Sequence, residues 1–170
     1  MTGAGFTVWV TGPEMGPVQA IAEQIAAGIA ARAWPVEPLG ASTPGIEVLA
    51  GEGGEQRVAF VAAALARHGV ATVVSLPAAA RAARERARTE LGRMVEVYVR
   101  PAAGAAAPDY EPPDRPEVEI TVPEAVPGAG AEQVLRTLEV LDMLPRREDR
   151  AYSEAEEREV IRRLKAFGYL

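Results

Sequence analysis

The chain has 170 residues, a length that fits one compact domain with a core of its own. It contains no cysteine and a single histidine, which excludes disulfides, thiolate metal sites and cysteine nucleophiles and argues against a histidine-cluster metal site. The net charge of −6 argues against a nucleic-acid or anionic membrane surface, because phosphates are met by clustered Lys and Arg. No apolar run approaches the ~20 residues of a membrane span, and the opening MTGAGFTVWV lacks a basic region and a cleavage site, so we expect a cytoplasmic protein without a signal peptide.

The first half of the chain alternates between strand and helix patterns. Residues 6–10 are β-branched, aromatic and uncharged, which predicts a buried strand that ends at Gly12. Apolar residues then recur at helical spacing over residues 18–29, and Pro17 suits the first helical position because its missing N–H has no acceptor there. Further along we expect a short strand at 36–39, a loop at 42–55, a helix at 55–67 that closes at His68, and an interior strand at 70–76.

The second half continues the alternation. Residues 78–92 predict a helix with a strongly basic face, residues 94–99 and 118–122 predict strands, and residues 131–144 predict a last helix. Strands that alternate with helices favour a parallel sheet covered on both faces. Such a sheet binds ligands at the carboxyl ends of its strands, which is where the turn at residues 12–17 falls.

The last part of the chain has a different character. We expect a domain over residues 1–145, a charged linker over 146–152 and a separate amphipathic helix over 153–170. Ser153 and Glu156 form a capping box at the start of this helix. Its apolar stripe predicts a helix that docks onto its own domain or onto a partner. The stripe consists of Val160, Ile161, Leu164 and Phe167.

Five segments, in this order along the chain, resemble the adenylylsulfate (APS) kinase family. They are GFTVWVTG, QRVAFVAAALARHGVATVVSL, RAARERAR, MVEVYV and PDYEPPDRPEVEI, the last of which is similar to the family's DPYEPPENPE. The resemblance covers about residues 5–144 and implies a P-loop NTPase-like, three-layer α/β fold with a mainly parallel five-stranded sheet flanked by helices. Members of the family transfer the γ-phosphate of ATP to the 3′-hydroxyl of APS with Mg²⁺.

The resemblance places a phosphate-binding loop at GPEMGPVQ, where the family has GxxGxGKS/T. In such a loop backbone N–H groups cradle the phosphates, a Lys reaches the β- and γ-phosphates and a Ser/Thr hydroxyl holds Mg²⁺. Val18 replaces the Lys and Gln19 replaces the hydroxyl. Pro17 removes a backbone donor, and Glu14 brings a carboxylate near the phosphate position. We therefore expect a degenerate loop made of Gly12, Pro13, Glu14, Met15, Gly16, Pro17, Val18 and Gln19.

Other positions of the family pattern are kept only in part. The family's acidic LDGD after the second strand is LGAS at residues 39–42, which supplies no carboxylate for a metal or a base. Arg57 matches the Arg of the family's NxxR, and Arg81 matches the Arg after its SPY, so both are candidates for binding an anion or substrate, with a solvated basic helix face as the alternative. The family's Lys/Arg-rich lid is missing, because residues 101–107 lead directly into PDYEPP.

These losses together predict a catalytically inactive relative of APS kinase that acts as a binding or interaction module linked to sulfate activation or sulfonucleotide metabolism. We assign no catalytic and no metal-binding residue and expect no binding of ATP or Mg²⁺. One alternative is an active APS kinase in which Arg57, Arg81 and loop acids replace the usual parts. Another is a non-catalytic sensor of a sulfonucleotide or other anion. The expected partners are a protein or a second copy of the chain, or such an anion, and neither nucleic acid nor membrane.

Overall fold

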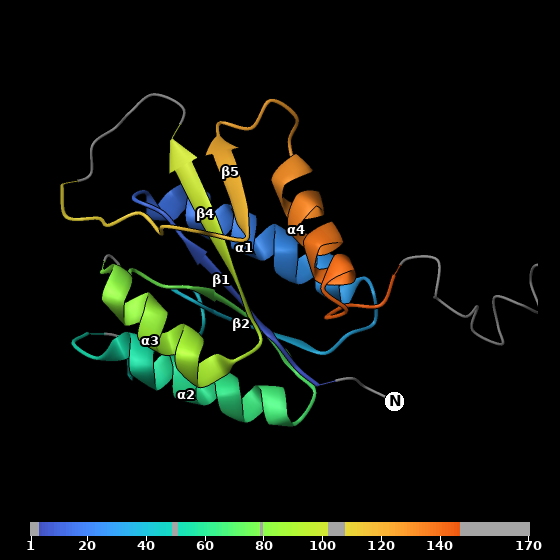
Figure 1. Cartoon of the computed structure of the whole chain (residues 1–170), viewed down its shortest axis with the longest axis horizontal. Helices are drawn as coiled ribbons and strands as arrows, with labels where there is room; N and C mark the ends of the chain where they lie inside the picture. The colour runs from blue at the N-terminus through green and yellow to red at the C-terminus, as the bar shows by residue number, and fades with distance from the viewer. Residues whose placement is uncertain (1–3, 49–50, 79, 102–107, 147–170) are drawn as a thin grey trace, which may run out of the picture.

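Five parallel strands form the central sheet of the protein (Figure 1). The computed structural model describes residues 4–48, 51–78, 80–101 and 108–146. The strand order across the sheet is β2-β3-β1-β4-β5, and every neighbouring pair is parallel. The predicted parallel sheet is therefore confirmed. The strands are β1 (Thr7–Thr11), β2 (Val36–Gly40), β3 (Ala71–Ser75), β4 (Met94–Pro101) and β5 (Val118–Val122).

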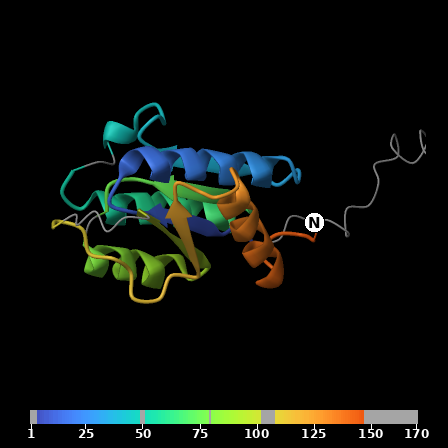
Figure 2. The same cartoon turned by 90° about the horizontal axis from the view of Figure 1, so that it is seen from above.

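Helices cover both faces of this sheet, as the sequence predicts. One face is covered by α1 (Met15–Ala30) and α4 (Ala129–Val140), and the other by α2 (Gly54–Arg67) and α3 (Arg81–Leu91). Seen from above, the strands lie between α1 and α3 (Figure 2). A short 3-10 helix, η1 (Ile46–Val48), lies within the segment that we expected to be a loop. Among the described residues, no helix combines the length and hydropathy needed to cross a bilayer.

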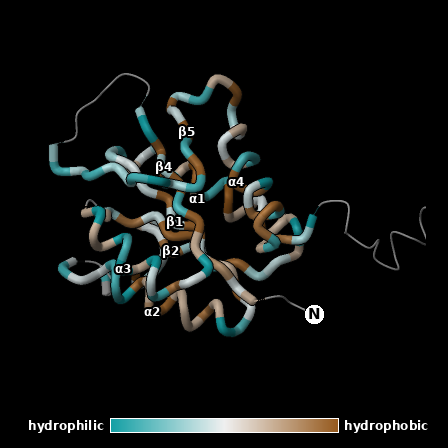
Figure 3. The backbone as a smooth tube through the Cα atoms, in the orientation of Figure 1, coloured by the Kyte–Doolittle hydropathy of each residue, from teal (hydrophilic) through white to brown (hydrophobic). Residues whose placement is uncertain are grey.

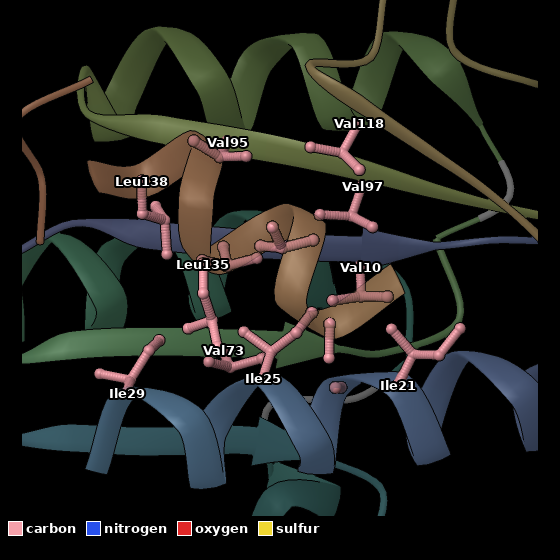
Figure 4. Packing of buried hydrophobic residues seen from close by; sticks show 14 of the residues in the cluster. Val10, Ile21, Ile25, Ile29, Val73, Val95, Val97, Val118, Leu135 and Leu138 are labelled. Atoms are coloured by element: carbon pink, nitrogen blue, oxygen red, sulfur yellow. The ribbon is translucent and has the colours of Figure 1, made fainter. Parts of the chain in front are cut away.

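The larger part of the core lies between the sheet and the α1–α4 pair. Ile21, Ile25 and Ile29 of α1 point toward the strands, and Leu135 and Leu138 of α4 close the same layer (Figure 4). All five side chains are buried, which explains the helical spacing of apolar residues in both segments. Hydrophobic residues gather on the strands, whereas the segment between β4 and β5 is mainly hydrophilic (Figure 3).

Both faces of β1 and β4 are buried, and the two faces differ in character. Val95, Val97 and Val99 of β4 face the α1–α4 layer. Met94 and Glu96 face the other layer, because successive side chains in a strand point to opposite sides. The carboxylate of Glu96 therefore points from the sheet into the α2–α3 layer.

Three element boundaries differ from the sequence predictions. Helix α1 begins at Met15, so Pro17 is its third residue and not its first; proline is tolerated there because the first four N–H groups of a helix have no intrahelical acceptor. Helix α3 begins at Arg81 and not at residue 78. Helix α4 ends at Val140, because the chain reverses at Asp142 (φ 52°) and the N–H groups of the next two residues both donate to the carbonyl of Leu138.

The other element predictions are confirmed within two residues at each end. Pro38 lies in β2, which is tolerated because β2 is at an edge of the sheet. His68 is the C-terminal cap of α2, as expected. The predicted linker at 146–152 lies outside the described residues apart from Arg146, and so does the whole predicted helix at 153–170.

Candidate functional site

The carboxyl ends of β1, β2 and β3 meet the N-terminus of α1 at one edge of the sheet. This is the edge at which a doubly wound sheet holds its ligand, since the chain leaves β1 at the point where the strand order changes direction. Gly12 follows β1 directly, and a Cβ atom at this position would lie 2.4 Å from the carbonyl oxygen of Val99. Glycine is therefore required here by the close approach of β4.

The connection from β1 to α1 is short, and the helix begins directly after it. Residues 12–14 make up the whole connection, and the helix is already formed at Met15. The N–H of Val18 donates to the carbonyl of Glu14 at 3.3 Å, while Pro17 has no N–H to offer. The side chain of Val18 is fully buried in the α1–α4 layer. The segment thus forms the first turn of a helix whose residue 18 faces the core, with Pro13 half-buried and Gly16 exposed.

Gln19 reaches the turn that follows β2. Its Nε2 donates to Ser42 Oγ and, at 3.1 Å, to Glu23 Oε1. The same turn is held by Thr43, whose Oγ1 accepts from the N–H of Gly40 at 3.0 Å and donates to the carbonyl of Pro38 at 2.9 Å. A cavity of about 300 Å³ lies at this edge. Its polar lining includes Gln19, Glu23, Glu37, Ser42, Thr43 and Ser75.

A side chain at position 40 would require Ser75 to move. A Cβ atom on Gly40 would lie 2.4 Å from Ser75 Oγ on the neighbouring strand. The family pattern places the first acid of LDGD at this position. Within the described ranges, no group of three or more His, Asp or Glu side chains is arranged to hold a metal ion.

The two candidate arginines are engaged with their own chain. Arg57 is exposed at the start of α2, and its Nη1 donates to the carbonyl of Glu52 at 3.0 Å. Arg81 starts α3, where its backbone N–H donates to Glu111 Oε2 at 2.8 Å and its Nη1 lies 2.6 Å from Asp114 Oδ1. Arg81 therefore ties α3 to the segment between β4 and β5.

Arg84 is the residue that sequence reasoning missed. Its side chain is 1% exposed, and its Nε donates to Glu96 Oε1 at 3.0 Å. Its two Nη atoms donate to the carbonyl oxygens of Ala78, at 2.6 Å, and of Glu111. The guanidinium lies over the ring of Tyr110, 5.3 Å from the centroid, a cation–π arrangement. The basic face of α3 is thus buried at its centre.

Tyr110 anchors the segment before β5 to the edge where the β1–α1 connection begins. Its hydroxyl shares a hydrogen bond of 2.9 Å with Thr11 Oγ1 at the end of β1, and its ring stacks on Tyr98 with centroids 6.1 Å apart. Burial raises the pKa of the Tyr110 phenol, although the bond to Thr11 opposes this shift. Tyr110 therefore ties the described part of the crossover to the end of β1.

Arg88 and Glu117 continue the same contact one turn further along α3. The guanidinium binds both carboxylate oxygens of Glu117, at 2.6 and 2.9 Å, and also reaches Glu96 Oε2 at 3.2 Å. The N–H of Glu96 donates to Glu117 Oε2 at 2.6 Å. Burial tends to raise the pKa of Glu117, but these bonds outweigh it and lower the pKa below its ordinary 4.5; the bond to Glu117 raises the pKa of Arg88.

Replacing Glu117 with glutamine is expected to lower the free energy of unfolding by about 1.5–2 kcal/mol at pH 7, because a bidentate charge-assisted pair is lost. The pKa of Glu117 is depressed in the fold, so its stabilisation is present above pH 4.5 and is lost as the pH falls through the folded value. Urea unfolding of both proteins should therefore give curves that converge in acid.

The matched control is Glu119→Gln, which removes an ion pair at the surface. The side chain of Glu119 is 44% exposed and that of its partner Arg100 is 53% exposed. Such a surface pair contributes about 0.5 kcal/mol or less. Equal losses for both substitutions, or a Glu117 effect that does not change with pH, would contradict the role assigned to Glu117.

The sheet order and the turn after β1 define a P-loop NTPase-like α/β fold. No protein-family model matches the chain. Over 172 aligned positions it is 31% identical to a probable adenylyl-sulfate kinase of Pyrococcus abyssi, covering 83% of this chain and 99% of that protein. It is 29% identical to an adenylyl-sulfate kinase of a Synechococcus strain, covering 74% and 93%. The chain belongs to the adenylyl-sulfate kinase family.

Solved structures agree on the fold. The Mycobacterium tuberculosis APS kinase CysC in complex with AMPPNP and APS superposes with a TM-score of 0.62 at 21% identity, over 80% of this chain and 98% of that one. The hexameric APS kinase from Thiobacillus denitrificans gives a TM-score of 0.65 at 23% identity, over 84% and 30%. The resemblance seen in the sequence is therefore confirmed for family and fold, and kinship links the chain to sulfate activation.

Proposed function

We propose that this member of the family is catalytically inactive and serves as a binding or interaction module. The observation that carries the proposal is the buried position of Val18, at the place where the family pattern has its lysine. A phosphate loop needs free N–H groups and an ammonium directed at the phosphates. Here the N–H of Val18 is bonded to Glu14 and its side chain lies in the core.

The metal side of the site supports the same proposal. Mg²⁺ is held by oxygen ligands, mainly carboxylates, hydroxyls and phosphates. At the positions where the family pattern has a hydroxyl and an acid, Gln19 and Ser42 bond to each other. Gly40, at the other acidic position, has no carboxylate, and its close neighbour there is the Ser75 side chain. Phosphoryl transfer depends on such a metal to neutralise developing charge.

The substrate side supports it as well. The guanidinium of Arg81 would have to leave Asp114 and the carbonyl of Pro112 before it could meet a sulfate or phosphate. Glu23 and Glu37 line the 300 Å³ cavity at the strand ends, and their carboxylates disfavour an anion there. The expected loss of the lid concerns residues 102–107, which lie outside the described residues.

Isothermal titration calorimetry with ATP–Mg²⁺, APS and 3′-phospho-APS tests the proposal. We expect no saturable heat with ATP–Mg²⁺ and no kinase turnover. Micromolar ATP binding with turnover that falls in Arg57→Ala would instead establish the active enzyme with a rebuilt site. Binding of a sulfonucleotide alone would establish the sensor. The absence of binding to all three would leave a protein partner or a second copy of the chain as the partner of this proposed cytoplasmic module.

A further inference from the structure

The cavity of about 300 Å³ at the strand ends extends under α1, between this helix and the strands β2 and β3. Its floor is formed by two register pairs of these strands, Pro38 with Val73 and Gly40 with Ser75. Val73 belongs to the α1–α4 layer, and side chains two positions apart in a strand share a face, so Ser75 points to the same side of the sheet. The cavity therefore lies inside this layer and not on the outer surface of a helix.

Small residues leave this space open. Position 22 on α1 is alanine, position 40 on β2 is glycine and position 75 on β3 is serine, and all three are buried. The apolar part of the wall comes mainly from Ala22, Val73 and Pro38. At about 30 Å³ per molecule, the volume corresponds to about ten waters, and it is at the lower end of the range of small-molecule sites. It therefore fits a compact ligand of about ten non-hydrogen atoms or fewer.

The hydroxyl of Ser75 is a polar group without a partner in this cavity. Ser75 is 4% exposed, and its Oγ has no hydrogen-bond partner among the described residues. Buried hydroxyls in folded proteins are nearly always hydrogen-bonded, because an unpaired one loses its hydration without compensation. A ligand atom that donates or accepts a hydrogen bond at the floor of the cavity would satisfy it.

The other end of the cavity is acidic. Gln19 bridges this end, since its Nε2 donates both to Ser42 Oγ and to Glu23 Oε1. A carboxylate has about four acceptor positions, and Gln19 is the one side-chain donor that Glu23 has among the described residues. No Lys, Arg or His is among the described residues that line the cavity. The charge at this end therefore favours a cation.

We propose that this cavity binds a small amphipathic cation, with an ammonium group at Glu23, an apolar body against Ala22 and Val73, and a hydroxyl or similar neutral group at Ser75. The inference rests on the proposed function and names the ligand of that binding module. An anion would meet carboxylates without a base. A bare metal ion would lack ligands, because no group of three or more acidic or histidine side chains is arranged for one within the described ranges.

Amide NMR titration of the ¹⁵N-labelled full chain with ω-amino alcohols of three to six carbons tests the proposal. The best of them should give saturable shifts in α1, β2 and β3 with a Kd of about 1 mM, a normal value for so small a ligand. Three probes of the same length serve as controls. The alkylamine lacks the hydroxyl and the diol lacks the ammonium, so both should bind severalfold more weakly, and the alkyl carboxylate should not bind.

Two substitutions assign the ends of the ligand. Ser75→Ala should weaken binding of the amino alcohol about fivefold and leave the alkylamine unchanged, because only the hydrogen bond at the floor is lost. Glu23→Gln should weaken both amines about threefold and leave the diol unchanged. The matched controls are Thr121→Ala on β5, at the opposite edge of the sheet, and Glu90→Gln, exposed on α3. Neither should change binding of any probe.

The inference is overturned if no amino alcohol gives a saturable shift, if the carboxylate binds as well as the amine, or if Ser75→Ala leaves the preference for the hydroxyl intact. Equal effects of Glu23→Gln and Glu90→Gln would also overturn it. A titration of the same sample with ATP–Mg²⁺ separates this failure from that of the proposed function. Saturable ATP–Mg²⁺ binding contradicts the proposed function, whereas binding of neither ATP–Mg²⁺ nor amines contradicts only the assignment of the cavity.

Discussion

Replacing Arg84 with methionine is expected to lower the free energy of unfolding by about 3–5 kcal/mol, because removal of one partner of a buried ion pair leaves an uncompensated charge. Glu96 would keep only its longer bond to Arg88, at 3.2 Å, and the carbonyl oxygens of Ala78 and Glu111 would lose their donor. Methionine retains most of the apolar stem, so the loss reports on the charge and its hydrogen bonds. Urea unfolding followed by circular dichroism measures it.

The matched control is Arg86→Met on the same helix. Arg86 is exposed, so its replacement should change the free energy of unfolding by less than about 0.5 kcal/mol. The double variant Arg84→Met/Glu96→Leu should recover part of the loss, because both buried charges are removed together. If Arg84→Met unfolds like Arg86→Met, the Arg84 network does not hold the crossover segment to the domain.

The elements of this fold could be predicted because their signals are local. The apolar residues of β1 and the spacing of Ile21, Ile25 and Ile29 are each confined to one element, and each fixes which face of that element is buried. The start of α1 could not be read in the same way. Pro17 is compatible with several positions in the first turn, and the choice among them depends on Val18 entering a core built from distant strands.

The role of the arginines on α3 could not be predicted for a related reason. Arg81, Arg84 and Arg88 share one helix face, and a basic face is compatible with solvent, an anion or an acidic segment of the same chain. The partners of Arg84 lie 12 and 27 residues further along the chain. Only the sheet order, with β4 beside β1 and the crossover returning over α3, brings them together. The roles expected for residues 12–19, as a loop that binds no ATP, and for Arg57 and Arg81, as candidates for binding an anion, are still predictions.

Replacing Val18 with lysine is expected to destabilise the fold by about 3 kcal/mol or more, because an unpaired ammonium would enter an apolar layer. The substitution restores the lysine of the family pattern. However, Val18 is fully buried and packs in the apolar α1–α4 layer. We therefore expect no gain of ATP–Mg²⁺ binding. Urea unfolding and calorimetry on the same sample measure both effects.

The control for this experiment is Ala20→Lys, which adds the same charge at an exposed position of the same helix. It should change the stability by less than about 0.5 kcal/mol. Calorimetry below the unfolding temperature of the weaker variant separates failure to bind from failure to fold. A stable Val18→Lys protein that binds ATP–Mg²⁺ would show that the helix start can reopen into a phosphate cradle, and that a single missing ammonium separates this chain from its active relatives. A destabilised protein without binding is the result expected if the first turn of α1 is held closed by the core beneath it.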